Sequence, residues 1–177
     1  MVFTYDTDIS MKTSAHMHLR PFTPSDSSTI LSWCKTRRAF RLWSADRYKT
    51  FPATPEDMAN QYADGIVYPL VAVVDNQIVG HLIIRYPSED KTVVRFGFVI
   101  IDDTKRDKGY GKAMLNLAID YAQKQLGAKK ITLGVFTENP SAIACYKSVG
   151  FKITSERNHI IDGEEWKGVE MEREITL

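Results

Sequence analysis

The spacing of hydrophobic positions changes several times along the 177-residue chain, and each change predicts a new element. An apolar run over 70–74 predicts a strand, and 78–86 predicts a second strand that the polar turn 75–77 joins to the first. The segment 92–101 predicts a third strand, which Gly97 interrupts. A glycine inside a strand indicates a bulge or a close approach by another backbone. Together these segments predict an antiparallel sheet.

Helical spacing follows the third strand. Apolar residues over 109–126 recur at intervals of three and four, and Gly127 provides a C-terminal stop. The later segments are a strand over 130–136, a helix over 140–149 and a hairpin of strands over 151–160 and 165–175. A strand, a helix and a second strand in this order imply a parallel crossover within an otherwise antiparallel sheet.

The N-terminal part is less regular. A short strand over 17–22 leads to a helix that begins near residue 24, and Thr54-Pro55 begins another helix that ends near residue 64. The segment 36–51 is rich in arginine and aromatic residues, and its pattern predicts no regular element. Residues 1–16 are polar and without a clear period, so we expect a poorly ordered extension before a single domain over 17–177.

Composition narrows the class of protein. Hydrophobic residues make up 44% and charged residues 25%, as in a folded globular protein. Lys+Arg is 23 and Asp+Glu is 22, and this balance argues against nucleic acid as a partner. The chain has no apolar stretch long enough to span a membrane, and its two cysteines form neither a disulfide framework nor a zinc motif. We therefore expect a cytoplasmic protein with no metal and no membrane partner.

The stretch 98–112 carries the chemistry that the sequence predicts. An apolar strand is followed by a charged turn and by Gly109 and Gly111, which open the long helix. The first turn of a helix has free backbone N–H groups and a positive dipole end, and glycines let a ligand approach that backbone closely. The basic residues around this helix start are Lys105, Arg106, Lys108 and Lys112. The arrangement predicts a pyrophosphate site.

Three other interpretations of these glycines compete. A dinucleotide-binding fingerprint needs a glycine or alanine three positions after Gly111, where this chain has Met114. A Walker A loop needs serine or threonine after Gly111-Lys112, where this chain has Ala113, and it needs an earlier glycine that is absent. The third interpretation is purely structural, with glycines that allow tight packing at a helix start.

Two motifs in this region resemble a known family. Arg106-x-x-Gly109-x-Gly111 is similar to the acetyl-CoA pyrophosphate loop of GNAT-type N-acetyltransferases, and 139–151 is similar to that family's N-x-x-A-x-x-x-Y-x-x-x-G-F segment. The resemblance covers roughly 17–175. It implies an α/β fold of the α+β type, in which a mixed, mainly antiparallel sheet is splayed between two central strands and has helices on both faces.

The resemblance also implies a role for each matched residue. The backbone of 99–101 would hold the pantetheine arm like an added strand, Asn139 would hydrogen-bond that arm, and Ala142 would leave room for it. Tyr146 would be the catalytic residue that protonates the leaving thiolate. The cofactor-binding residues expected on this basis are Val99, Ile100, Ile101, Arg106, Asp107, Lys108, Gly109, Tyr110, Gly111, Lys112, Asn139, Ala142 and Tyr146.

The general base is not evident from the motifs. Many members of the family place a glutamate on the strand that corresponds to 92–101, whereas this strand has Arg95 and no acid. A water relay or a base from elsewhere would then be needed. The candidates are Glu138, Asp46, His81 and His159.

The resemblance implies transfer of acetyl from acetyl-CoA to a primary amine by direct attack. The acceptor would be a small molecule, a protein N-terminus or a lysine, bound between 36–51 and 151–166. Arginines and aromatic rings in 36–51 suit an acidic or planar acceptor, but Trp43 and its aromatic neighbours can equally fill the core. The missing glutamate supports an alternative, a CoA-binding regulatory or interaction module without catalysis. The sequence leaves open whether the protein is a monomer or a homodimer.

Overall fold

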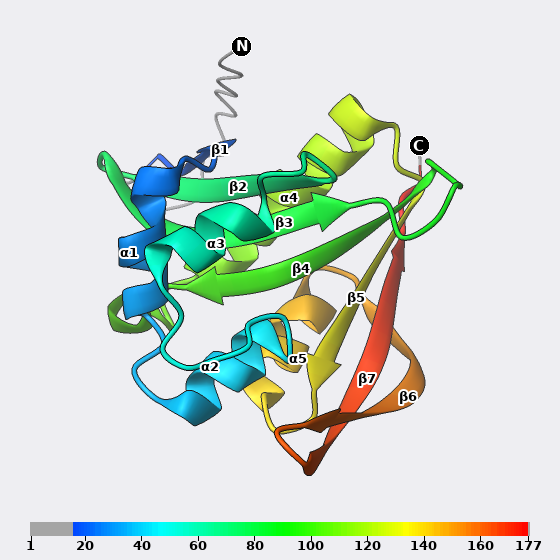
Figure 1. Cartoon of the computed structure of the whole chain (residues 1–177). Helices are drawn as coiled ribbons and strands as arrows, with labels where there is room; N and C mark the ends of the chain where they lie inside the picture. The colour runs from blue at the N-terminus through cyan, green and yellow to red at the C-terminus, as the bar shows by residue number, and fades with distance from the viewer. Residues whose placement is uncertain (1–15, 177) are drawn as a thin grey trace.

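Residues 16–176 are described by the structure, a computed structural model (Figure 1). The expected N-terminal extension lies outside these residues, apart from His16. Within 16–176 one sheet has the strand order β1-β2-β3-β4-β5-β7-β6, and each neighbouring pair is antiparallel except β4 and β5. The strands are β1 (His18–Pro21), β2 (Val67–Val74), β3 (Gln77–Arg85), β4 (Val93–Ile101), β5 (Lys130–Phe136), β6 (Lys152–Ile161) and β7 (Glu164–Glu174). The mixed sheet and its parallel crossover through the long helix are confirmed.

Helices cover both faces of the sheet, as expected, with α1, α2 and α3 on one face and α4 and α5 on the other (Figure 1). The helices are α1 (Ser27–Ser32), α2 (Arg37–Ser44), α3 (Pro55–Gln61), α4 (Tyr110–Leu126) and α5 (Pro140–Ser148), with 3₁₀ turns η1 (Pro24–Asp26) and η2 (Asp103–Lys105). Thr54 forms a capping box with Asp57 at the start of α3. Gly109 and Gly127 adopt the left-handed conformation at the two ends of α4. No helix in 16–176 has both the length and the apolar character needed to cross a bilayer.

The continuous apolar run of β2 is explained by burial on both faces. Leu70, Ala72 and Val74 join the core beneath α4, while Val71 and Val73 join the core beneath α1 and α3. Side chains alternate between the faces of a strand, so a strand covered on both sides needs apolar residues at every position.

The sheet opens between β4 and β5. These two parallel strands pair only where Val93–Arg95 meets Lys130–Thr132, and then they diverge. β4 also carries a bulge against β3, between the pairs His81–Ile100 and Ile83–Gly97. The residue with the unusual backbone is Phe98, with φ of +49°, and not its neighbour Gly97. The Trp43 indole N–H donates to the Phe98 carbonyl over 2.9 Å, which ties the bulge to α2.

The segment 36–51, to which the sequence assigned no element, forms α2 and the loop after it. Thr36 caps the helix by accepting from the Ala39 amide. The Arg41 side chain is 3% exposed, and its guanidinium donates to both carboxylate oxygens of Asp162, over 2.9 and 3.2 Å. Arg38 forms ion pairs with Glu138 and Glu164. The ion-pair partners of α2 are thus about 100 residues or more away in the sequence, beyond the reach of a local pattern.

Candidate active site

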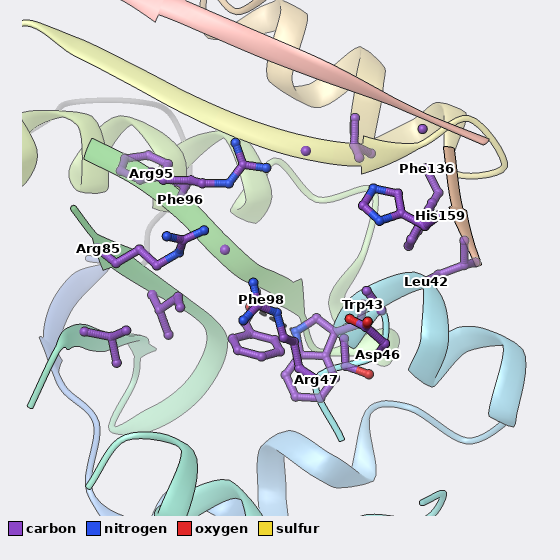
Figure 2. A pocket seen from close by; sticks show the side chains of 18 of the residues that line it. Leu42, Trp43, Asp46, Arg47, Arg85, Arg95, Phe96, Phe98, Phe136 and His159 are labelled. Atoms are coloured by element: carbon purple, nitrogen blue, oxygen red, sulfur yellow. Dashed lines mark hydrogen bonds between the residues drawn. The ribbon is translucent and has the colours of Figure 1, made fainter. Parts of the chain in front are cut away.

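A cavity of about 900 Å³ occupies the opening between β4 and β5 (Figure 2). Its walls come from the end of α2 and the loop after it, from the end of α3 and its loop, and from β3, β4, β5, β6 and β7. Leu42–Arg47, Arg157 and His159 line it, so both segments expected around an acceptor face this space. Trp43 is among the lining residues, whereas Tyr48 is buried in the core and Phe51 packs against it. The aromatic residues of 36–51 therefore divide between cavity and core.

Tyr146 and Asn139 line the same cavity from α5 and from the residue before it. Tyr146 is buried, its hydroxyl forms no hydrogen bond with another residue of the described chain, and burial raises its pKa well above the ordinary value. The phenol therefore keeps its proton at physiological pH and is available to donate it. The Asn139 side-chain oxygen caps α5 by accepting from the Ala142 amide over 3.2 Å. Asn139 thus has a structural role beside the one expected of it.

The loop 105–112 leads from β4 into α4, and three of its basic side chains are exposed: Arg106, Lys108 and Lys112. Gly109 has φ of +81°, and a Cβ there would meet nothing within 4 Å. A Cβ on Gly111 would instead lie 3.3 Å from the Cys145 sulfur. Gly111 therefore serves the packing of α4 on α5, the structural interpretation, while Gly109 keeps the backbone open toward solvent. The residues fit an anion such as a pyrophosphate, because backbone N–H groups, the helix dipole and positive charge converge there.

The backbone of Val99, Ile100 and Ile101 borders the opening of the sheet. Ile100 and Ile101 pair with β3 on one side, but β4 pairs with β5 only as far as Arg95. The β5-facing edge of this segment thus has no strand partner within 16–176, and it is free for an extended ligand. Ala142 is half-buried and packs against the core at α5. Asp107 has φ of +60° in the loop, and Tyr110 begins α4.

The charged lining of the cavity includes four arginines and three acids, and sequence reasoning singled out only Arg95 among the arginines on the strands. Figure 2 shows Arg85 and Arg95 extending into the cavity from the adjacent strands β3 and β4. Arg95 forms a two-point ion pair with Glu170 of β7, over 2.7 and 3.1 Å. A Cβ on Gly134 would come within 2.9 Å of the Arg95 guanidinium, so the glycine makes room for this bridge across β5. No local motif marks Arg85, Gly134 or Glu170, because strand register alone brings them together.

The four candidate bases now separate. His81 is fully buried, and its ring lies 2.8 Å from both the Leu70 carbonyl oxygen and the Tyr62 hydroxyl. Both ring nitrogens of His81 have core partners, the ring does not line the cavity, and burial lowers its pKa to about 4, so we do not propose it as the base. Glu138 is held by Arg38. Asp46 and His159 are the two candidates that line the cavity (Figure 2).

Comparison with known proteins agrees with this geometry. A family model described as the acetyltransferase (GNAT) family matches residues 36–151. An L-amino acid N-acetyltransferase of Escherichia coli is 32% identical over 99 residues, which cover 54% of this chain and 60% of that protein. A spermidine N(1)-acetyltransferase of Vibrio cholerae is 24% identical over 151 residues, covering 84% of each chain. The match thus spans 60% of the length of the first relative and more of the second.

Solved structures show the same fold. The spermidine N-acetyltransferase of Vibrio cholerae, in complex with CoA and spermine, superposes with a TM-score of 0.74 at 21% identity, covering 88% of this chain and 94% of that one. A ribosomal-protein-S5-alanine acetyltransferase of Vibrio fischeri superposes with a TM-score of 0.72 at 19% identity, covering 94% and 97%. With the family model matched over most of the domain and the splayed sheet in place, the chain belongs to the GNAT acetyltransferase family.

Proposed function

We propose that this protein transfers the acetyl group of acetyl-CoA to the nitrogen of a primary amine. One observation carries the proposal: α5 connects two sites. Its Cys145 packs beside Gly111 in the first turn of α4, where the basic loop lies, and the next residue, Tyr146, lines the cavity. A ligand with a pyrophosphate at the loop and a reactive end near Tyr146 would meet an acceptor held in the cavity.

The residues proposed to hold acetyl-CoA follow the path from loop to cavity. Arg106, Lys108 and Lys112 supply charge, and the amides around Gly109 to Lys112 supply donors for the pyrophosphate. The free edge of 99–101 offers backbone groups to the pantetheine arm, and Asn139 offers its side-chain amide N–H, since its oxygen is occupied as a helix cap. When bound, acetyl-CoA supplies an acetyl thioester as the group to be transferred.

The chemistry needs two proton transfers, one from the amine and one to sulfur. The amine nitrogen forms a bond to the acetyl carbon, and the bond from that carbon to sulfur breaks. The Tyr146 O–H gives its proton to the leaving sulfur, and because burial raises its pKa the phenol carries that proton at physiological pH. The proton released by the amine goes to a group at the cavity, directly or through water, and Asp46 and His159 are the described side chains that we propose for it.

The relatives do not settle which amine is acetylated. Their names include an amino acid, a polyamine and an alanine of a ribosomal protein, which differ in charge and size. We propose a cytoplasmic enzyme, consistent with the two free thiols of Cys34 and Cys145.

Thiol release from acetyl-CoA over a panel of amines, together with calorimetric titration of acetyl-CoA, tests the proposal. We expect affinity in the micromolar range and turnover on at least one primary amine. Absence of acetyl-CoA binding at high micromolar concentration would refute the proposal. Tight binding without turnover on any amine would instead support the alternative of a CoA-binding module.

A further inference from the structure

Two arginines of the cavity stand directly opposite each other in the sheet. Arg85 of β3 and Arg95 of β4 are partners in the antiparallel register, so their side chains leave the same face of the sheet side by side. Like charges in such a pair destabilise a sheet. The arrangement therefore costs stability and has to be explained by what the two groups bind.

Arg95 has its partner inside the protein. Its guanidinium is fixed on Glu170, and Arg157 donates to the same carboxylate over 3.3 Å. Glu170 therefore already faces two guanidinium groups, and it does not pair with Arg85.

Arg85 is the half-buried cation that remains. Arg47 lines the cavity from the loop after α2. Within 16–176, the guanidinium groups of Arg85 and Arg47 form no ion pair and no hydrogen bond with another residue. Burial is the largest cause that lowers the Arg85 pKa, followed by the charges of Arg95 and Arg47, while Glu170 opposes them. The positive charges of Arg95 and Arg47 thus outweigh the negative charge of Glu170 at Arg85.

The other acids of the lining, Asp46 and Asp64, are not among the charges that shift the pKa of Arg85. Asp46 and Asp64 are both exposed, and Asp64 accepts a hydrogen bond from the Ile66 amide over 3.0 Å. Figure 2 places Asp46 near Trp43, at the other side of the cavity from Arg85. An acceptor with a negative group at Arg85 and a free amine elsewhere in the cavity would match this distribution of charge.

Resting on the proposed acetyl transfer, we infer that the acceptor is an amine with a carboxylate, such as an α-amino acid, and that Arg85 with Arg47 binds the carboxylate. A guanidinium matches a carboxylate with two parallel N–H donors. Arg85 is accordingly the residue that separates amino acids from polyamines as substrates.

The experiment compares each amino acid with its carboxamide, which lacks the negative charge. Glycine, leucine, phenylalanine and glutamate are assayed for acetylation beside their carboxamides and beside spermidine. We expect kcat/KM for at least one amino acid to exceed that of its carboxamide by about tenfold or more, the size of a charge-assisted hydrogen bond. The carboxamide has the less basic amine and hence more of its reactive neutral form, so a preference for the acid cannot come from amine basicity.

Variants then assign the preference to Arg85. Arg85→Gln is expected to lose about tenfold or more in kcat/KM on the acid and less than threefold on the carboxamide, and Arg85→Lys to recover part of the loss. Arg85→Gln removes one of two like charges that face each other across the strands. The midpoint of thermal unfolding should therefore stay unchanged or rise, and this measurement shows that the variant folds. Lys124→Gln changes the net charge equally on an exposed part of α4, and we expect kinetics like those of the unmodified protein.

The outcomes separate the two proposals. Acetylation of spermidine or of the carboxamides at rates equal to or above the acids overturns the carboxylate site and leaves acetyl transfer standing. If no amine is acetylated, acetyl transfer fails, and titration of N-acetylphenylalanine against its carboxamide in the presence of CoA tests the anion site alone. Equal affinity for those two compounds would then overturn it.

Discussion

The cofactor loop (105–112) and the acceptor cavity are both cationic, but they are built in opposite ways. The loop gathers its charge from eight consecutive residues beside one helix start, and its basic side chains are largely exposed. The cavity takes arginines from β3, β4, β6 and the loop after α2. Arg85 of β3 and Arg95 of β4 are half-buried, whereas the other two are exposed. The first site is a local property of the chain, and the second exists only once the sheet has formed.

This difference changes what the charges do. Exposed charges attract a ligand from solution but are screened by salt, whereas partly buried charges are screened less and must be paired or used. Of the two half-buried arginines, Arg95 is accordingly paired with Glu170, and Arg85 is the one that we propose for a ligand. The following predictions test this division, from the largest expected effect to the smallest.

Tyr146 lies where the two regions meet, and its removal should affect chemistry alone. Tyr146→Phe deletes the proton donor and leaves the buried ring in place, so we expect kcat to fall by about a hundredfold or more, as for loss of a general acid. Affinity for acetyl-CoA, measured by calorimetry, should stay within about twofold. Unchanged turnover would remove Tyr146 from the mechanism.

His81 belongs to neither region, and its effect should be on folding. Its pKa is about 4 in the folded protein against the ordinary 6.5, so the unfolded state binds the proton first as the pH falls. The contribution of neutral His81 to the free energy of unfolding is therefore complete above about pH 6.5. It falls by up to about 3 kcal/mol as the pH is lowered toward 4. Urea unfolding at pH 7 and 4.5 should show a smaller pH dependence for His81→Gln than for the parent. Equal dependence would contradict the burial argument.

The ion pairs of Glu170 with Arg95 and Arg157 at the cavity should contribute to stability. Glu170→Gln leaves Arg95 and Arg157 without their carboxylate, and we expect the free energy of unfolding to fall by about 1–2 kcal/mol. Asp120→Asn breaks the exposed Lys124–Asp120 pair on α4 and should cost less than about 0.5 kcal/mol. Urea denaturation measures both, and equal costs would mean that the Glu170 pair is no better shielded than a surface pair.

Two glycines of α4 provide a matched test of the loop. Gly109 and Gly127 both have positive φ, and both have open space where a Cβ would stand. Alanine at either position should cost about 1 kcal/mol of stability through the left-handed backbone. Only Gly109→Ala should also weaken acetyl-CoA binding, by about three- to tenfold, because its Cβ faces the ligand. Similar binding by both variants would place the pyrophosphate elsewhere.

The smallest expected effect is the dependence of the two KM values on salt concentration. Between 50 and 500 mM NaCl the exposed charges of the loop are increasingly screened, so we expect KM for acetyl-CoA to rise about two- to fivefold. KM for the acceptor should change less, because Arg85 is half-buried. A steeper rise for the acceptor would reverse the comparison.

Much of the fold followed from the hydrophobic pattern. β5 is found at its predicted residues, and the helix expected over 109–126 is α4 with a one-residue difference at its start. These elements carry strong local signals, since glycines end the helix and alternation defines the strand. The pattern gave no sign of α2, because its three arginines are paired with Asp162, Glu138 and Glu164, which come from distant elements. The positive φ angle at the bulge of β4 belongs to Phe98 and not to Gly97, because the Trp43 indole of α2 binds the Phe98 carbonyl.

The sequence by itself determined the family, the crossover topology and the basic helix start, because each lies within a short continuous stretch whose physical signal is local. The tertiary structure decided what the acceptor meets. Cross-strand register placed Arg85 beside Arg95, and the divergence of β4 from β5 created the cavity. His81 is buried in the core and does not line this cavity. Those facts depend on contacts between residues far apart in the chain, and no pattern of neighbouring residues encodes such contacts.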